Sequence, residues 1–140
     1  RPVLLAASTR EGEEALVLDA YSRMAIEGLL LLLVPRHPQR FGEVAALLQK
    51  RKLAYARRSD EGILPQDCRV LLGDSMGEMA AYYAACDLAF IGGSLLPYGG
   101  QNLIEACAVG RPLLFGPHMY NFAEASKLDD QDRARFQWGH

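Results

Sequence analysis

Short aliphatic runs alternate along the chain with longer segments in which apolar residues recur at helical spacing. The run Leu29–Val34 is apolar without interruption, which is typical of a central parallel strand covered on both faces. The other runs are short and bounded by turn residues, and they also predict strands. The strands expected from this pattern are Val3–Ala7, Leu29–Val34, Leu53–Arg57, Arg69–Leu72, Asp87–Ile91 and Pro112–Phe115.

The helical pattern is clearest after the second strand, where apolar residues follow i, i+3, i+4, i+7 spacing at Phe41, Val44, Ala45 and Leu48. The other expected helices are Glu13–Ile26, Met76–Ala85, Asn102–Val109 and Asn121–Lys127. This alternation predicts an α/β fold, a Rossmann-like, doubly wound parallel sheet of about six strands with helices on both faces. The polar segment 129–140 is expected to be a tail or a truncated helix.

Composition narrows the class of protein. The chain has 140 residues, half of them hydrophobic, and a formal net charge of −2, which fits one domain with a proper core. Basic residues cluster only at Arg51–Lys52 and Arg57–Arg58, without interleaved aromatics, so no nucleic-acid partner is expected. The longest apolar run is too short to cross a bilayer. The start at Arg1-Pro2, almost directly on a strand, suggests a segment of a longer protein.

Three cysteines, Cys68, Cys86 and Cys107, are odd in number and lack C-x-x-C spacing. Cys86 and Cys107 sit among alanines and aliphatic residues, which indicates buried free thiols, and the three cysteines together indicate a reducing, cytosolic compartment. No group of His, Cys, Asp and Glu has the spacing of metal ligands, so no metal is expected. No G-x-G-x-x-G follows the first strand and no Walker A sequence occurs, and no cofactor is expected.

The strand-to-helix junctions carry the candidate chemistry, because ligands of such sheets bind at the carboxyl ends of the strands. The segment Gly92–Glu105 places two glycine pairs between a strand and a helix expected to begin near Asn102. Glycines let the backbone approach a ligand, and a helix start offers N–H groups to an anion. This loop suits a nucleotide or a phosphorylated sugar.

The junction Pro35-Arg-His-Pro38 holds Arg36 between two prolines at the end of a buried strand. A guanidinium fixed there suits bidentate recognition of phosphate or carboxylate. The alternative is a surface arginine beside a structural turn. His37 is more often structural than a proton donor in such a setting.

The junction Gly73–Glu78 fits two interpretations. Ser75 and Glu78 match a capping box, and Asn102 and Glu105 can be interpreted in the same way, so helix capping explains each Glu taken alone. Capping does not explain Gly77, which costs about 1 kcal/mol inside a first helical turn. A ligand lying against the backbone would explain it.

The junctions together resemble the 3-deoxy-D-manno-octulosonic acid (Kdo) transferases. The resemblance covers residues 3 to about 127 in order, and it is to the carboxyl-terminal half of those enzymes. The motifs that carry it are Ser8-Thr-Arg-Glu-Gly-Glu-Glu14, Val34-Pro-Arg-His-Pro-Gln-Arg40, Gly73-Asp-Ser-Met-Gly-Glu-Met79, Gly92-Gly-Ser94, Gly99-Gly-Gln-Asn102 and Phe115-Gly-Pro-His-Met-Tyr-Asn-Phe122.

This resemblance implies a GT-B glycosyltransferase, which has two Rossmann-like halves with a cleft between them. The carboxyl-terminal half binds the donor CMP-Kdo, and the enzyme transfers Kdo to a lipid A precursor at the cytoplasmic face of the bacterial inner membrane. Residues 1–128 would be the donor-binding domain. Only the full-length protein would bind the lipid A precursor and associate with the membrane.

The resemblance also assigns the donor contacts. Arg36 would meet the phosphate or carboxylate of the donor, Met76 and Gly77 would lie against CMP, and Glu105 would accept from the ribose hydroxyls. The full set of substrate-binding residues implied is Pro35, Arg36, Met76, Gly77, Glu78, Asn102, Leu103, Ile104 and Glu105.

The chain departs from the family's pattern in two ways that affect its expected activity. The family commonly has His where this chain has Gln101, and an amide cannot supply imidazolium charge. The family's catalytic base lies in the amino-terminal half, so no residue here is expected to be the general base and this chain alone should be inactive. The alternatives are a GT-B transferase that uses a UDP- or GDP-sugar, and a non-catalytic Rossmann-like binding module.

Overall fold

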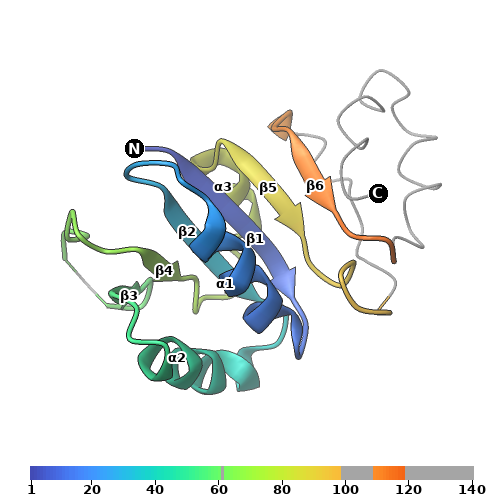
Figure 1. Ribbon diagram of the computed structural model, residues 1–140, viewed down its shortest axis with the longest axis horizontal. Coiled ribbons are helices and arrows are strands. Elements are labelled where there is room, and N and C mark those ends of the chain that lie inside the picture. The colour runs from blue at the N-terminus through green and yellow to red at the C-terminus, as the bar shows by residue number, and fades with distance from the viewer. Residues whose placement is uncertain (61, 99–108, 119–140) are drawn as a thin grey trace.

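The computed structural model describes residues 1–60, 62–98 and 109–118 (Figure 1). Strands and helices alternate through these residues, as the hydrophobic pattern predicts. The elements are β1 (Val3–Thr9), α1 (Glu13–Arg23), β2 (Leu30–Pro35), the 3-10 helix η1 (Pro38–Arg40), α2 (Phe41–Lys50), β3 (Tyr55–Arg57), β4 (Val70–Leu72), α3 (Met79–Ala85), β5 (Leu88–Ile91) and β6 (Leu113–Phe115).

The six strands form one sheet in the order β3-β4-β2-β1-β5-β6, and every neighbouring pair is parallel. β1 is central, since Leu4 is the register partner of Leu31 on one side and of Leu88 on the other. The fully apolar strand β2 is buried along its whole length, as expected for a strand covered on both faces. The predicted α/β doubly wound sheet is confirmed.

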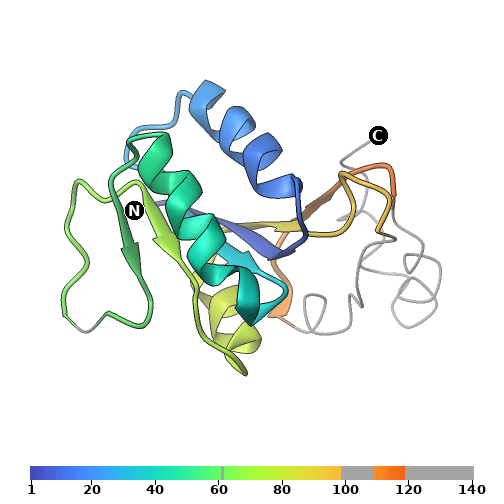
Figure 2. The same ribbon diagram turned by 90° about the horizontal axis from the view of Figure 1, so that it is seen from below.

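Helices cover both faces of this sheet. Figure 2 shows α1 and α2 on one side and α3 on the other. Because successive residues of a strand point to opposite faces, Leu4 and Ala6 join the core under α1 and α2, whereas Leu5 and Ala7 pack with Tyr83 of α3. The two cores share β1, which is why this strand is buried from Leu4 to Thr9.

Most element boundaries differ from those predicted by one to three residues, and three of these differences have a local cause in the backbone. β1 continues to Thr9, through an irregular register at Ser8, whose φ is +55°. α1 ends at Arg23 rather than Ile26, because Met24 adopts an extended backbone. α3 begins at Met79 rather than Met76, because Gly77 has a φ of +75°, outside the right-handed helical region.

Several predictions concern residues that the structure does not describe. The helix Asn121–Lys127, the tail 129–140 and all but the last residue of the helix Asn102–Val109 lie outside the described ranges. Cys68 and Cys86 are buried free thiols, which confirms the prediction for Cys86, and Cys107 also lies outside the described ranges. Within the described part of the chain, no helix combines the length and apolar character needed to span a membrane.

Candidate ligand-binding rim

All strands run in one direction, so the loops that follow them emerge at one edge of the sheet. We call this edge the carboxyl rim; it comprises Arg10–Gly12 after β1, Arg36–His37 after β2, Gly73–Glu78 after β4 and Gly92–Tyr98 after β5. The chain passes from β1 to β2 on one side and later returns to β5 on the other. The carboxyl end of β1 is therefore the topological switch point, where ligands of open α/β sheets bind.

The first turn of α1 carries two buried carboxylates at this switch point. Gly12 precedes the helix with a φ of +88°, and Glu13 follows it, completely buried. The Glu13 carboxylate accepts hydrogen bonds from the backbone N–H groups of Arg10, at 2.8 Å, and Gly93, at 2.7 Å. It also accepts from Leu95 at 2.9 Å. These donors and the positive end of the helix dipole stabilise the buried charge.

Glu14 binds in the opposite direction, toward the loop after β2. Its two oxygens accept hydrogen bonds from the two terminal nitrogens of Arg40, at 2.8 and 2.9 Å. Its Oε2 also accepts a hydrogen bond from the Thr9 hydroxyl at 2.7 Å. The hydrogen bond to Glu14 raises the pKa of the Arg40 guanidinium above its ordinary value. Neighbouring glutamates thus anchor the loops on the two sides of β1.

Arg36, one of the predicted substrate-binding residues, lies directly beside the end of β1. Pro35 is the last residue of β2 and the register partner of Thr9, and the Arg36 N–H donates to the Thr9 carbonyl at 2.8 Å. The backbone is therefore fixed while the Arg36 side chain is exposed. His37 has an extended backbone and leads into η1, whose first residue is Pro38.

The glycine loop after β5 is built around backbone packing. Gly92 donates its N–H to the Ala7 carbonyl at 2.7 Å, and a Cβ at this position would overlap the Ser8 carbonyl oxygen. Glycine at residue 92 is thus required by the crossing of two chain segments, not by a ligand. Ser94 is fully buried, and its Oγ accepts the Gly116 N–H at 2.8 Å, which ties this loop to the end of β6.

The loop after β4 contains the second group of residues that were predicted to bind the substrate, Met76, Gly77 and Glu78. Met76 is 61% exposed, although methionine is a residue type usually found inside. A Cβ at Gly77 would meet no atom within 4 Å, so open space lies beside this backbone. Glu78 pairs with Arg58 at 3.2 Å. The hydrogen bond from Ser75, together with the charge of Arg58, lowers the pKa of Glu78.

The capping interpretation of this loop is wrong. Glu78 is itself the N-cap residue of α3, and no side-chain cap hydrogen bond forms there. The Ser75 hydroxyl pairs with the Tyr82 hydroxyl, and its hydrogen bond to the Glu78 side chain does not cap the helix, because it satisfies no backbone N–H. Gly77 has a positive φ, which is the conformational reason for glycine at this position. The predicted helix began at Met76 and therefore gave Gly77 a right-handed helical backbone that it does not have.

The sequence predicted correctly that some residues lie at the carboxyl rim, and it missed others. Arg36 and the segment Met76–Glu78 follow the adjacent strands β2 and β4 and share one edge. Asn102–Glu105 and Gln101 lie outside the described residues. The buried pair Glu13–Glu14 was missed as a functional element, since acidic residues in a first helical turn usually lie in solvent. The signal available was two adjacent carboxylates directly after a buried strand and a glycine turn.

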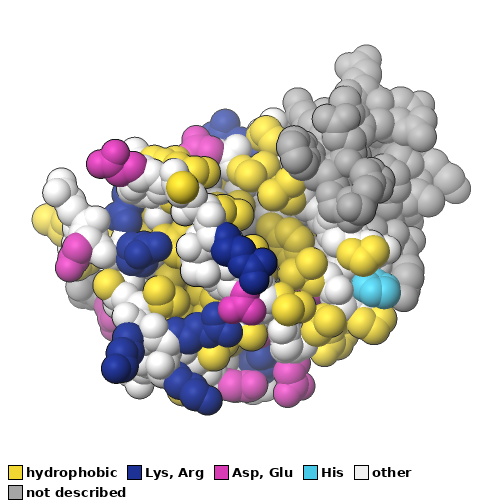
Figure 3. Space-filling view, viewed as in Figure 1, with side chains coloured by type: hydrophobic (Ala, Val, Ile, Leu, Met, Phe, Trp, Pro, Cys, Tyr) yellow, Lys and Arg dark blue, Asp and Glu magenta, His cyan; other side chains and the backbone are white. Residues whose placement is uncertain are grey.

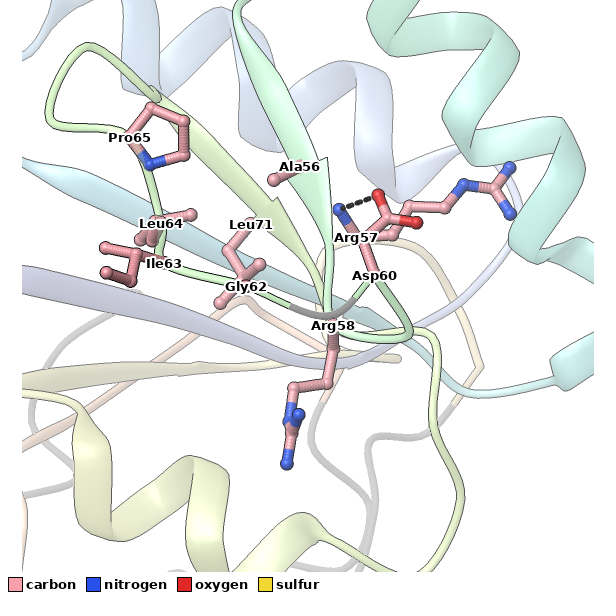
Figure 4. A pocket seen from close by; sticks show the side chains of 9 residues that line it. All are labelled: Ala56, Arg57, Arg58, Asp60, Gly62, Ile63, Leu64, Pro65 and Leu71. Atoms are coloured by element: carbon pink, nitrogen blue, oxygen red, sulfur yellow. Dashed lines mark hydrogen bonds between the residues drawn. The ribbon is translucent and has the colours of Figure 1, made fainter.

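The pocket in Figure 4 lies beside the rim at the edge strand β3, with a volume of about 260 Å³. Its wall combines Ala56 and Leu71 of the sheet with the segment 62–65, and none of the predicted donor residues lines it. The charged side chains at its mouth are compensated, since Arg57 lies 3.7 Å from Asp74 and Arg58 pairs with Glu78. It offers no unpaired charge to an anion among the residues that line it.

Charge is mixed over the face shown in Figure 3. Lys and Arg side chains lie there among acidic and apolar ones, and hydrophobic side chains gather toward the lower right of the described part. A groove of about 430 Å³ separates α1 from α2 and reaches the rim at Gly12 and Arg40. The Arg40 guanidinium in this groove pairs with Glu14 and lies 3.4 Å from Glu43, and Glu11 and Lys50 also line the groove.

Comparisons with known proteins give a consistent result. No family model matches the chain. It is 54% identical over 133 residues to 3-deoxy-D-manno-octulosonic acid transferase of Bordetella pertussis, which covers 91% of the chain and 31% of the relative. It is 44% identical over 130 residues to the transferase of the same name from Haemophilus influenzae, covering 91% of the chain and 30% of the relative. The chain thus spans about a third of the length of these curated relatives.

The fold also matches a solved structure. The crystal structure of the C-terminal CMP-Kdo binding domain of WaaA from Acinetobacter baumannii superposes with a TM-score of 0.81 at 36% sequence identity. The match covers 96% of this chain and 71% of that one. The sheet of this chain therefore has the fold of that crystallised domain.

Proposed function

The chain belongs to the 3-deoxy-D-manno-octulosonic acid (Kdo) transferase family, and on this premise we propose that it is the donor-binding half of a GT-B glycosyltransferase. The whole enzyme would transfer Kdo from CMP-Kdo to a lipid A precursor. The observation that carries the proposal is the arrangement of the rim: Arg36 and Met76–Glu78 follow adjacent strands next to the switch point. The similar crystallised domain is described as one that binds CMP-Kdo.

The work of this half is to position the donor and to stabilise the leaving group. The backbone of Arg36 is held by its bond to Thr9, so its exposed guanidinium can meet the phosphate of CMP, which departs with negative charge. The exposed Met76 side chain and the open space at Gly77 accommodate the nucleoside. Asn102–Glu105 complete the donor site in this proposal, with Glu105 on the ribose hydroxyls.

The acceptor site and the general base belong to the other half of the enzyme. No residue of this chain is assigned the role of base, so the chain by itself should bind CMP and turn nothing over. The full-length protein would act at the cytoplasmic face of the bacterial inner membrane, where its acceptor lies. Co-sedimentation of the full-length protein with inner-membrane vesicles tests that placement.

Calorimetric titration of CMP into the 140-residue chain tests the donor site. Wild type should bind CMP, and Arg36→Ala should bind it about tenfold or more weakly, because a charge-assisted hydrogen bond to phosphate is lost. Arg23→Ala, at the far end of α1, is the matched control and should bind like wild type. Equal affinity of wild type and Arg36→Ala would remove Arg36 from the site.

Thermal shift with three nucleotides tests the identity of the donor. A ligand present at about 100 times its Kd stabilises the folded state by about 2.7 kcal/mol. CMP should therefore raise Tm more than UDP or GDP at equal concentration. A larger shift with UDP or GDP would point to a different nucleotide-sugar, and no shift with any nucleotide would point to a non-catalytic binding module.

A further inference from the structure

Five arginines lie at or directly after the carboxyl end of a strand or directly before α2: Arg10, Arg36, Arg40, Arg57 and Arg58. Three of them are neutralised by carboxylates, in the pairs Arg40–Glu14, Arg57–Asp74 and Arg58–Glu78. Within residues 1–60, 62–98 and 109–118, no carboxylate pairs with Arg10 or Arg36. These two guanidinium groups therefore carry uncompensated charge at the switch point.

The two arginines leave the sheet side by side. Thr9 and Pro35 are register partners at the ends of β1 and β2, and Arg10 and Arg36 are the next residues on each strand. The Arg36 N–H donates to the Thr9 carbonyl at 2.8 Å, so the two backbones are joined where the side chains begin.

The guanidinium of Arg10 is held in place by the glycine loop. It stacks on the ring of Tyr98, with Cζ 4.5 Å from the ring centroid, well within the range of a cation–π contact. The Tyr98 hydroxyl donates to the Glu11 carbonyl at 2.9 Å, and the Arg10 N–H donates to Glu13 at 2.8 Å. Stacking occupies the face of the guanidinium and leaves its edge N–H groups available for a bidentate oxyanion.

We propose that Arg10 is a second oxyanion-binding residue of the donor site, next to Arg36, and that Tyr98 positions it. This inference rests on the proposed function, because the donor CMP-Kdo carries two acidic groups, the phosphate of CMP and the carboxylate of the sugar acid. One guanidinium for each group would match the two uncompensated arginines. The shared chemistry is a planar or tetrahedral oxyanion, and the choice between phosphate and carboxylate is decided by the experiment below.

Calorimetry with cytidine, CMP and CMP-Kdo on the 140-residue chain separates these contributions. Arg10→Gln should weaken CMP-Kdo binding by about tenfold to a hundredfold, the range expected for losing charged hydrogen bonds, and leave cytidine binding unchanged. A loss already seen with CMP assigns Arg10 to the phosphate, and a loss seen only with CMP-Kdo assigns it to the carboxylate. Arg23→Gln is the control and should bind all three ligands like wild type.

Three further variants keep the test valid if Arg10→Gln folds poorly. Arg10→Lys retains the charge but not the fork and should weaken CMP-Kdo binding less than Arg10→Gln. Tyr98→Phe keeps the ring but loses the hydroxyl bond to Glu11, so it should weaken CMP-Kdo binding less than Tyr98→Leu, which should lose most of the Arg10 contribution. Wild-type affinity for CMP-Kdo in Arg10→Gln, with Arg36→Gln impaired, overturns the inference alone. Failure of wild type to bind any of the nucleotides overturns the proposed function and this inference with it.

Discussion

The Glu13 carboxylate accepts the backbone N–H of Gly93 at 2.7 Å, although 80 residues separate them along the chain. This contact joins the first turn of α1 to the glycine loop after β5, and Leu95 and Arg10 donate to the same carboxylate. The next residue, Glu14, anchors Arg40 beyond β2. The distance between the two loops that flank the switch point is therefore set by one acidic dipeptide.

Glu13→Gln should destabilise the folded chain by about 1–3 kcal/mol, because an amide presents one acceptor oxygen and leaves buried N–H groups without a partner. Urea denaturation followed by circular dichroism measures this. The control Glu11→Gln changes an exposed carboxylate in the same loop and should cost less than about 0.5 kcal/mol. Equal effects of the two substitutions would contradict the anchoring role of Glu13.

Gly92→Ala should destabilise the fold by about 3 kcal/mol or more, because the added methyl group would overlap the backbone of Ala7 and Ser8, which cannot move without breaking β1. Gly42→Ala is the matched control. Gly42 lies in α2 with no atom within 4 Å of the added Cβ, so alanine there should stabilise by about 0.5–1 kcal/mol. Thermal unfolding of both variants checks the opposite signs, and a tolerated Gly92→Ala would show that the crossing is looser than described.

Arg40→Met should cost about 3–5 kcal/mol, because it leaves the Glu14 carboxylate buried without its partner. The exposed pair Arg51–Asp19 provides the comparison, and Arg51→Met should cost no more than about 1 kcal/mol. Denaturant midpoints of both variants measure the difference. A cost for Arg40→Met as small as that for Arg51→Met would mean that water reaches Glu14.

The raised pKa of Arg40 predicts no pH dependence near neutrality from that guanidinium. A raised pKa means that its contribution to stability is complete below the ordinary guanidinium pKa and is lost only as pH rises above it. Between about pH 5 and 9, the contribution should therefore be constant.

Glu78 predicts a pH dependence on the acid side. Its pKa is lowered by the Ser75 hydrogen bond and by Arg58, so its contribution to stability is complete above the ordinary value of 4.5. That contribution is lost as the pH falls through the lowered pKa of the folded state. Ser75→Ala should shift the pKa of Glu78 upward, as measured by NMR titration of its side-chain carboxyl carbon. An unchanged titration would mean that Arg58 alone sets this pKa.

The alternation of apolar runs and helical spacing was sufficient to predict six parallel strands, the central place of the Leu29–Val34 run and helices on both faces. These features follow from local periodicity and from the rule that parallel strands need crossovers, both of which can be read along the chain. The position of Arg36 at the rim followed from the same rule, because its junction ends a buried strand. The whole series of strand ends then had to share one edge.

Tertiary structure alone decided why particular residues occupy the rim. Residue 92 must be glycine because the backbone of Ala7 and Ser8 passes against it. Residue 77 is glycine because its φ is positive. Glu13 is buried because three backbone N–H groups of a distant loop surround its carboxylate. Such causes join residues up to 83 positions apart and leave no periodic trace in the sequence. Local pattern determines which elements form, and long-range backbone contacts determine which side chains remain free to meet a ligand.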